Sequence, residues 1–240
     1  MAKTDKRPRR QTREEKVTNS FKEAAPLQPL TQGQSEYIHA LKHRPIIVCT
    51  GYAGTSKTYC ATRVAALLLK QGAVDKLVYA RPAVSASKSL GFFKGDKVEK
   101  MKEWVAPVMD VLKLEFSFGQ LEYMMKEEIG MIEGVPLETI KGRSFKDTFV
   151  LVDEAEDLTV KEIVSLLTRI GENTTLVLAG DIAQSDLSKS GLGEFLKLRS
   201  KNQKLQNAIE HIDFNEPEDI VRSDVCRDII LGLEEIGQSV

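Results

Sequence analysis

A glycine-rich octapeptide between two apolar segments is the first feature of this chain that could do chemistry. It consists of Gly51, Tyr52, Ala53, Gly54, Thr55, Ser56, Lys57 and Thr58. Where such a loop joins a strand to a helix, its backbone N–H groups wrap phosphates and the helix N-terminus adds its dipole. Lys57 would then reach the β- and γ-phosphates, and the Thr58 hydroxyl would bind Mg²⁺. The octapeptide predicts a nucleoside-triphosphate site of the Walker A type, with an ordinary strand-to-helix turn as the alternative.

Two carboxylates follow an apolar run near the middle of the chain. Residues 149–152 would form a buried strand, and Asp153 and Glu154 come directly after it. Open α/β sheets bind ligands at the carboxyl ends of their strands, where both side chains would lie. Asp153 is expected to hold Mg²⁺ through water, and Glu154 to orient or deprotonate the attacking water. The pattern is typical of a Walker B segment, although a polar loop after a strand is common on its own.

A third polar group follows the apolar run 175–179. Gly180 and Asp181 come directly after it, with Gln184 and Asp186 shortly beyond. In helicase-like ATPases this position holds a sensor of the γ-phosphate, and the Gln184 amide can donate to a phosphate oxygen or to the attacking water. The alternative is a simple turn, because Gly-Asp after a strand is a frequent turn sequence.

Gln34 precedes the first apolar strand and allows two interpretations. With Thr31 it has the spacing of a capping box at a helix N-terminus. Its amide, which carries both a donor and an acceptor, could instead read the N6 and N7 edge of adenine. One amide cannot serve both roles fully, and the sequence leaves both open.

Alternating strands and helices would position these motifs. Strands are expected at 46–49, 77–80, 149–152, 175–179 and 209–214, and most of them are unbroken apolar runs. Helices are expected at 31–43, 57–70, 97–114, 118–128, 159–170 and 224–236. Such an alternation is typical of an α/β fold with a mainly parallel sheet and helices on both faces.

Composition and charge suggest one folded domain with a basic extension. No apolar run reaches the length of a membrane span, and the N-terminus lacks the apolar block of a signal peptide, so we expect a cytoplasmic protein without a membrane partner. Residues 1–25 are expected to be a disordered basic tail, which either attracts nucleic-acid phosphates or aids solubility. The domain would span 26–240, with an insertion at about 83–142 lying over one end of the sheet. Three cysteines without metal-ligand spacing are expected to be reduced and buried: Cys49, Cys60 and Cys226.

With these motifs in place, the chain resembles the PhoH-like protein family over roughly residues 29–233. The Walker motifs are shared by many families, whereas several short segments in the family's order are more specific. The matching segments are 34–37, 51–58, Arg81-Pro82-Ala83-Val84, Leu90-Gly91-Phe92, Lys141-Gly142-Arg143-Ser144-Phe145, Val152-Asp153-Glu154-Ala155, Gly180-Asp181 with Gln184 and Asp186, and Asp219-Ile220-Val221-Arg222.

The resemblance implies a RecA-like P-loop NTPase core related to superfamily 1 helicases, ATP hydrolysis, and a role in RNA metabolism. The small size and missing accessory domain resemble a phage member, which would act in the host cytoplasm. Two departures from the family pattern leave open whether turnover is weakened. Ser56 replaces the glycine that normally precedes the lysine, and Glu156 replaces a glutamine beside the metal site.

Three arginines remain as candidates. Arg222 lies late in the chain, where related ATPases place an arginine finger, with a surface salt bridge as the alternative. Arg81 and Arg143 are expected at the same end of the sheet, where each would contact nucleotide or nucleic-acid phosphates or form a structural ion pair. The histidines show no ligand spacing and are expected on the surface or in helix packing.

These residues favour a Mg²⁺-dependent ATPase coupled to RNA or single-stranded nucleic acid. Glu154, Gln184 and Arg222 would be catalytic, and Thr58 and Asp153 would hold the metal. A helicase normally uses two lobes and this chain has room for one, so a homo-oligomer such as a ring is expected, with Arg222 reaching a neighbour's γ-phosphate. The alternative is a nucleotide-gated binding module without enzymatic activity, which would hold RNA or a host protein.

Overall fold

Short strands rich in Val, Ile and Leu form the centre of the protein. The computed structural model describes residues 24–82, 105–140, 142–185 and 189–236. Within these residues, six strands pair in parallel in the order β3-β2-β4-β5-β1-β6. They are β1 (Ile46–Gly51), β2 (Lys76–Arg81), β3 (Ile132–Pro136), β4 (Thr148–Val152), β5 (Thr175–Ala179) and β6 (Glu210–Phe214).

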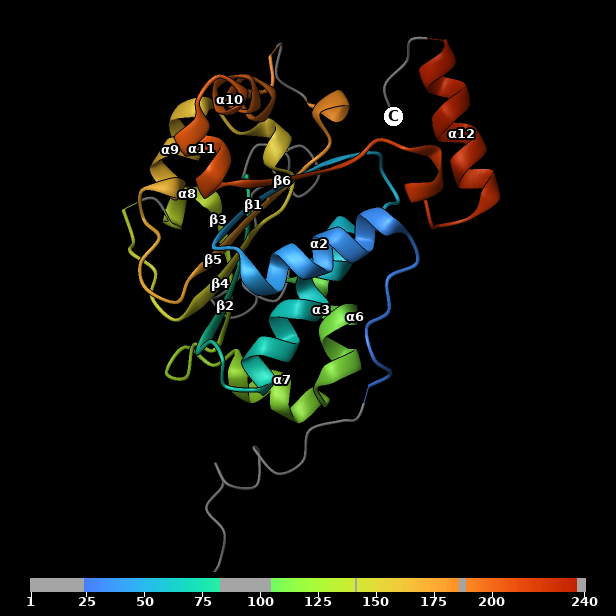
Figure 1. The fold of residues 1–240 in the computed structure, drawn as a ribbon. Helices are drawn as coiled ribbons and strands as arrows, with labels where there is room; N and C mark the ends of the chain where they lie inside the picture. Colours follow the sequence, from blue (N-terminus) through green and yellow to red (C-terminus); the bar gives the residue numbers. More distant parts are fainter. Residues whose placement is uncertain (1–23, 83–104, 141, 186–188, 237–240) are drawn as a thin grey trace, which may run out of the picture.

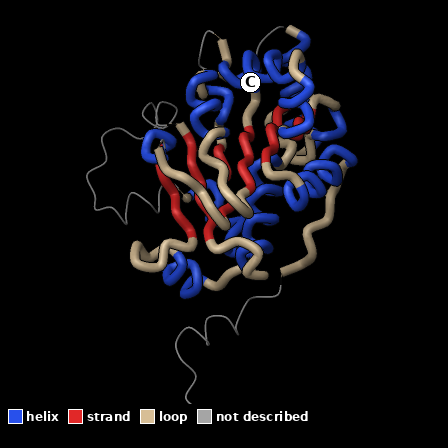
Figure 2. The backbone as a smooth tube through the Cα atoms, turned by 60° about the vertical axis from the view of Figure 1, so that its left-hand side comes forward, coloured by secondary structure: helices blue, strands red, loops and turns tan. Residues whose placement is uncertain are grey.

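Helices cover both faces of this sheet (Figures 1 and 2). One face carries α2 (Gln32–His43), α3 (Lys57–Lys70), α6 (Ala106–Glu115) and α7 (Phe118–Met124). The opposite face carries α8 (Leu137–Ile140), α9 (Val160–Leu167), α10 (Gly191–Ser200) and α11 (Gln203–Ala208). The last helix, α12 (Asp224–Glu235), stands at the side of the molecule and buries only Ile230 among its described residues.

Two hydrophobic cores follow from the alternation of side chains along the central strands. In β4, Phe149 and Leu151 join the core beneath α2, α3 and α6, whereas Val150 and Val152 join the core beneath α9 and α10. Because both faces of each central strand are buried, the middle residues of these strands are almost all apolar. The expected α/β fold of the RecA-like P-loop NTPase type, with a parallel sheet covered on both faces, is confirmed.

The strand order brings three predicted motifs together. In the sheet, β4 lies beside β5, and β5 lies beside β1. All strands run in the same direction, so the segments that follow β1, β4 and β5 meet at one edge of the sheet. These segments are the P-loop (residues 51–58), the pair Asp153 and Glu154, and the segment 180–184.

The segment after β2 differs most from expectation. Residues 83–142 were expected to form an insertion over one end of the sheet, but within this range residues 132–136 form the edge strand β3. The helices α6 and α7 pack beside α3 on one face of the sheet. The sequence patterns did not predict β3, α10 or α11. The tail residues 1–23, the segment 83–104 and Asp186 lie outside the described residues.

Smaller expectations have mixed outcomes. Cys49 and Cys60 are buried as expected, whereas Cys226 on α12 is only half-buried, because most of that helix faces solvent. The helix expected at 159–170 is present as α9, which a capping box of Thr159 and Glu162 begins and which ends at Leu167. No helix in the described part of the chain is long and apolar enough to cross a membrane.

Candidate nucleotide-binding site

A cavity of about 500 Å³ lies where β1, β4 and β5 end. The chain brings most of the predicted site residues into its lining, although they come from three separate motifs. The lining includes Ala53 to Thr58, Asp153, Glu154, Glu156, Gly180, Asp181, Gln184 and Arg222. The size and the polar lining fit a phosphate-bearing ligand.

The P-loop backbone has the conformation that phosphate binding requires. Gly51 has φ of 117°, and a Cβ there would overlap the carbonyl of Phe214 on β6, so glycine is needed at this position. Gly54 also has a positive φ, and so does Ser56, which has φ 69° and ψ 27°. Ser56 therefore occupies a left-handed conformation that costs about 1 kcal/mol or more for a residue with a Cβ. Successive turns of this kind point several N–H groups inward.

Lys57 and the rest of the P-loop are held by local hydrogen bonds. The Lys57 ammonium donates to the carbonyl oxygens of Gly51 (2.6 Å) and Tyr52 (2.7 Å). These bonds fold the Lys57 side chain back over the P-loop. Lys57 is the first residue of α3, and the N-terminus of this helix is where a phosphate is expected to bind. Tyr52 itself donates to Glu234 of α12 at 2.6 Å, and this hydrogen bond raises the pKa of Tyr52 to about 12.

Thr58 and Asp153 form the candidate metal site. The Thr58 hydroxyl donates to Asp153 Oδ1 at 2.8 Å, and the Tyr79 hydroxyl donates to Oδ2 at 3.0 Å. Burial raises the pKa of Asp153, although both hydrogen bonds oppose that shift. No group of three or more His, Cys, Asp or Glu side chains able to hold a metal occurs among the described residues. An oxygen pair of this kind fits Mg²⁺, which takes one or two protein ligands together with substrate phosphates.

Glu154 lies beside this pair and reaches the same cavity. Its backbone is left-handed, with φ 55° and ψ 41°, which is uncommon outside glycine and is often found at functional sites. The Glu154 carboxylate accepts a hydrogen bond from Arg81 at 3.3 Å. Arg81 therefore makes the ion pair that was the structural alternative for it, and its partner is the predicted general base.

Glu156, the second departure from the family pattern, packs against the sensor segment. Its side chain is 7% exposed, and its Oε2 accepts a hydrogen bond from the Asp181 N–H at 3.1 Å. Gly180 must be glycine, because a Cβ there would come within 2.8 Å of the Glu156 backbone nitrogen and would also overlap the Glu156 carboxylate. Burial raises the pKa of Glu156 to about 7. At neutral pH this residue is therefore partly uncharged and adds less negative charge than its type suggests.

Gln34 lies behind the P-loop, beside a second cavity of about 530 Å³ that shares Ser56 with the first. Its Oε1 accepts from Leu30 N–H at 2.8 Å, and its Nε2 donates to the Thr55 carbonyl at 3.3 Å. Thr31 caps α2 as expected, but Gln34 bonds to Leu30 rather than closing the capping box. Gln34 is 2% exposed, and its amide supports the P-loop through the bond to Thr55. Recognition of adenine by this amide stays a prediction.

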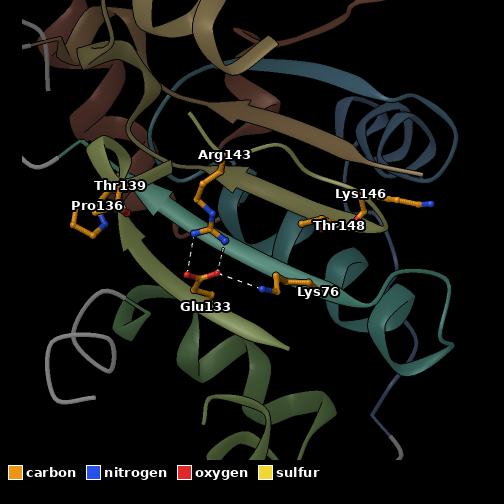
Figure 3. A network of polar contacts seen from close by, with 7 residues as sticks. All are labelled: Lys76, Glu133, Pro136, Thr139, Arg143, Lys146 and Thr148. Carbon is orange, nitrogen blue, oxygen red and sulfur yellow. Dashed lines mark hydrogen bonds and ion pairs between the residues drawn. The ribbon is translucent and has the colours of Figure 1, made fainter. Parts of the chain in front are cut away.

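Arg222 and Arg143 occupy very different places. Arg222 lines the cavity beside its own P-loop, with its Cγ 3.4 Å from where a Gly54 Cβ would be. Arg143 lies over edge strand β3 and is outside the lining of this cavity. Its guanidinium forms two hydrogen bonds of 2.8 and 2.9 Å with Glu133, which Lys76 approaches to 3.6 Å (Figure 3). Arg143 therefore makes the structural ion pair that was the alternative for it. It was expected at the same end of the sheet as Arg81, but its partner Glu133 lies near the start of β3.

The sequence did not identify several residues that support the site. Tyr79 orients Asp153, and the Phe214 carbonyl accepts the Tyr52 N–H at 2.9 Å. Asp219 is buried and accepts a 2.9 Å hydrogen bond from the Thr31 hydroxyl. The tyrosine carries a usable signal, since a hydroxyl in a buried strand must find a partner. The contacts of Phe214 and Asp219 depend on where β6 lies in the sheet, and a sequence pattern does not predict that position.

Comparisons with known proteins identify the family of this chain. The sequence profile of the family described as PhoH-like protein matches residues 26–234. Protein PhoH of Escherichia coli (strain K12) is 32% identical, over 93% of this chain and 66% of its own length. A PhoH-like protein of Bacillus subtilis (strain 168) is 35% identical, over 90% of this chain and 66% of its own length. The chain thus spans just under two thirds of the length of these relatives.

Among solved structures, the large terminase of a thermophilic bacteriophage superposes with a TM-score of 0.49. The sequences are 11% identical, and the match covers 82% of this chain and 48% of the terminase. At this level the likeness says nothing about function.

Proposed function

The chain belongs to the PhoH-like protein family, and from that premise we propose that it is a Mg²⁺-dependent ATPase coupled to RNA or single-stranded nucleic acid. The observation that carries the proposal is the contact between Thr58 at the P-loop and Asp153 at the end of β4. It puts two hard oxygen donors beside Glu154, in one cavity with Lys57. That combination suits hydrolysis of a metal-bound triphosphate.

Each residue has a definite role in this proposal. The P-loop N–H groups and Lys57 bind the β- and γ-phosphates, and Thr58 and Asp153 hold Mg²⁺, which would neutralise charge on the phosphates. Glu154 accepts a proton from the attacking water, and Gln184 donates a hydrogen bond to the γ-phosphate. Arg222 stabilises the charge that develops on the γ-phosphoryl oxygens.

Nucleic-acid coupling, assembly and location are proposed on different grounds. The family resemblance supports RNA or single-stranded nucleic acid as the partner. The segment 3–22 holds eight basic and three acidic residues, so it would add salt-dependent affinity for phosphates. We also propose homo-oligomers in the cytoplasm.

Phosphate release by purified protein tests the proposal. We expect Mg²⁺-dependent ATP turnover that rises when single-stranded RNA is added. Glu154→Gln should keep ATP binding but lower turnover by about 10²-fold or more, the usual scale for a positioned base. Lys57→Ala should lose ATP binding in titration calorimetry, because its ammonium is the cation at the start of α3. Turnover by Glu154→Gln equal to the parent protein would assign the base to another residue.

The second candidate is a nucleotide-gated binding module without turnover, which would hold RNA or a host protein. The left-handed Ser56 and the buried Glu156 favour it, because both depart from the family pattern beside the phosphates. The same assay separates the two candidates. ATP binding without phosphate release, in the presence and absence of RNA, would support the module and contradict the ATPase.

A further inference from the structure

Arg81, the last residue of β2, is joined to the proposed general base by an ion pair. Arg81 ends β2, and Glu154 follows the end of the neighbouring strand β4, since Ala80 pairs with Val152 and accepts the Asp153 N–H at 2.9 Å. Arg81 Nη1 lies 3.3 Å from Glu154 Oε1. The arginine side chain is 15% exposed, whereas that of Glu154 is 38% exposed. The better-anchored member of the pair is therefore the cation.

Glu154 needs such an anchor to act reproducibly. Its backbone is left-handed, and its side chain is 38% exposed, so little packing holds the carboxylate. A glutamate has three rotatable side-chain bonds, so an unrestrained carboxylate would sample several positions. A general base is effective only within hydrogen-bond reach of the proton that it takes.

We propose that Arg81 is the positioning residue of Glu154. The guanidinium is fixed at the end of β2 and holds Oε1, so that Oε2 can face the attacking water. Arg81 itself is outside the cavity lining, whereas Glu154 is part of it, so the arginine acts through the glutamate and not on the nucleotide. This inference rests on the proposed ATPase activity, in which Glu154 is the base.

A second arginine on the same sheet provides a matched control. Arg143 also pairs with a glutamate at a strand, Glu133 on β3, through two hydrogen bonds of 2.8 and 2.9 Å (Figure 3). The side chains of Arg143 and Glu133 are 34% and 25% exposed, and both residues lie away from the P-loop cavity. Arg143→Gln therefore removes one positive charge, as Arg81→Gln does, but leaves the contacts of Glu154 unchanged.

Steady-state ATP hydrolysis by Arg81→Gln, Arg81→Lys and Arg143→Gln tests the inference. We expect Arg81→Gln to lower kcat about 10- to 100-fold with KM for ATP unchanged, because small misplacements of a catalytic group have effects of this size. Arg81→Lys should recover part of the loss, since it keeps the charge. Arg143→Gln should retain the parent kcat. In a Glu154→Gln background, Arg81→Gln should have no further effect, because the group that it positions is gone.

Other outcomes would overturn the assignment. A raised KM would mean that Arg81 binds the nucleotide, and a raised kcat would mean that it restrains Glu154 from reacting. A lower melting temperature with unchanged kcat would make the pair structural, and equal losses in both backgrounds would uncouple the two residues. If the parent protein releases no phosphate, the ATPase proposal fails and this inference fails with it. A parent-like Arg81→Gln refutes this inference alone.

Discussion

Ser56 is held in a backbone conformation that glycine adopts more easily. Its φ of 69° is in the left-handed region, where a Cβ approaches the following carbonyl. We expect Ser56→Gly to raise the free energy of unfolding by about 1 kcal/mol, because the relief of strain exceeds the entropy that glycine adds to the unfolded chain. Urea unfolding measures the change.

The same substitution at Ser35 is a suitable control. Ser35 lies on the exposed side of α2, in helical backbone, so glycine there should lower the free energy of unfolding by roughly 0.5 kcal/mol. Opposite signs at the two positions would identify backbone strain at Ser56. A loss of stability at both would show that the P-loop holds serine without strain.

Glu156 should make stability depend on pH. Its carboxyl has a pKa of about 7 in the folded protein, compared with an ordinary value of 4.5. Between these values the unfolded chain releases the proton while the folded chain keeps it, so the stabilising contribution is present below about 4.5 and is lost as pH rises through 7. The loss is about 3 kcal/mol by order of magnitude.

Glu156→Gln isolates this contribution, since its amide oxygen can still accept the Asp181 N–H. The difference in free energy of unfolding between variant and parent should grow in favour of the variant from pH 4.5 to 8. Metal-free buffer avoids competing effects of cations at Asp153. Parallel stability curves for the two proteins would mean that Glu156 titrates normally.

At the scale of elements, a buried ion pair joins α3 to α6. Arg63 of α3 lies 2.9 Å from Glu115 of α6, and their side chains are 5% and 2% exposed. Arg63 also donates to the Ala25 carbonyl at 2.7 Å and so fixes the segment that precedes α2. We expect Glu115→Ala to lower the free energy of unfolding by about 3 kcal/mol or more, because it leaves a buried charge without its anion.

An exposed pair on the same helix is the control for Glu115. Asp110 contacts Lys113 at 2.8 Å, and its side chain is 89% exposed. Asp110→Ala should change stability by less than about 0.5 kcal/mol, as usual for surface positions. Thermal and urea unfolding of both variants check the comparison. Equal effects would mean that water reaches Glu115 and screens its charge.

The elements that the sequence predicts are those with a local signal. Strand β4 is an apolar run followed by acids, and α9 begins with the Thr159–Glu162 capping box. Edge strand β3 has the sequence Ile-Glu-Gly-Val-Pro, in which glycine, proline and a charge obscure the pattern. Its place beside β2 is a tertiary contact. For the same reason the sequence located Glu154 but not Arg81 as its partner.

At the scale of the whole molecule, the cavity gathers more acidic than basic side chains. Its lining includes four carboxyl groups, of Asp153, Glu154, Glu156 and Asp181, and the two cations Lys57 and Arg222. A triphosphate would meet repulsion there unless a bound cation offset it. We expect chelation of Mg²⁺ to weaken ATP binding at least 10-fold, measured by calorimetry with and without EDTA. Equal affinities would remove Mg²⁺ from the binding step.

The path of the chain after β6 brings Arg222 to its own P-loop. The Val221 N–H donates to the Gly54 carbonyl at 3.1 Å, and Arg222 follows at the rim of the same cavity. Two acids near Arg222 in the sequence have other partners: Asp219 accepts from Thr31, and Asp224 pairs with Arg227. This position favours contact with the γ-phosphate of the same subunit over the expected contact with a neighbour.

Mixing two inactive variants distinguishes these arrangements. Arg222→Ala should lower turnover by about 10³-fold, the scale for an arginine on the γ-phosphate, and Lys57→Ala should abolish ATP binding. If Arg222 acts within its own subunit, each variant subunit carries its own defect. A mixture should then stay at the sum of the separate activities, even where mass spectrometry shows mixed oligomers. Recovery in the mixture would mean that an intact Arg222 serves a neighbour's intact P-loop, since only a shared site can combine the two.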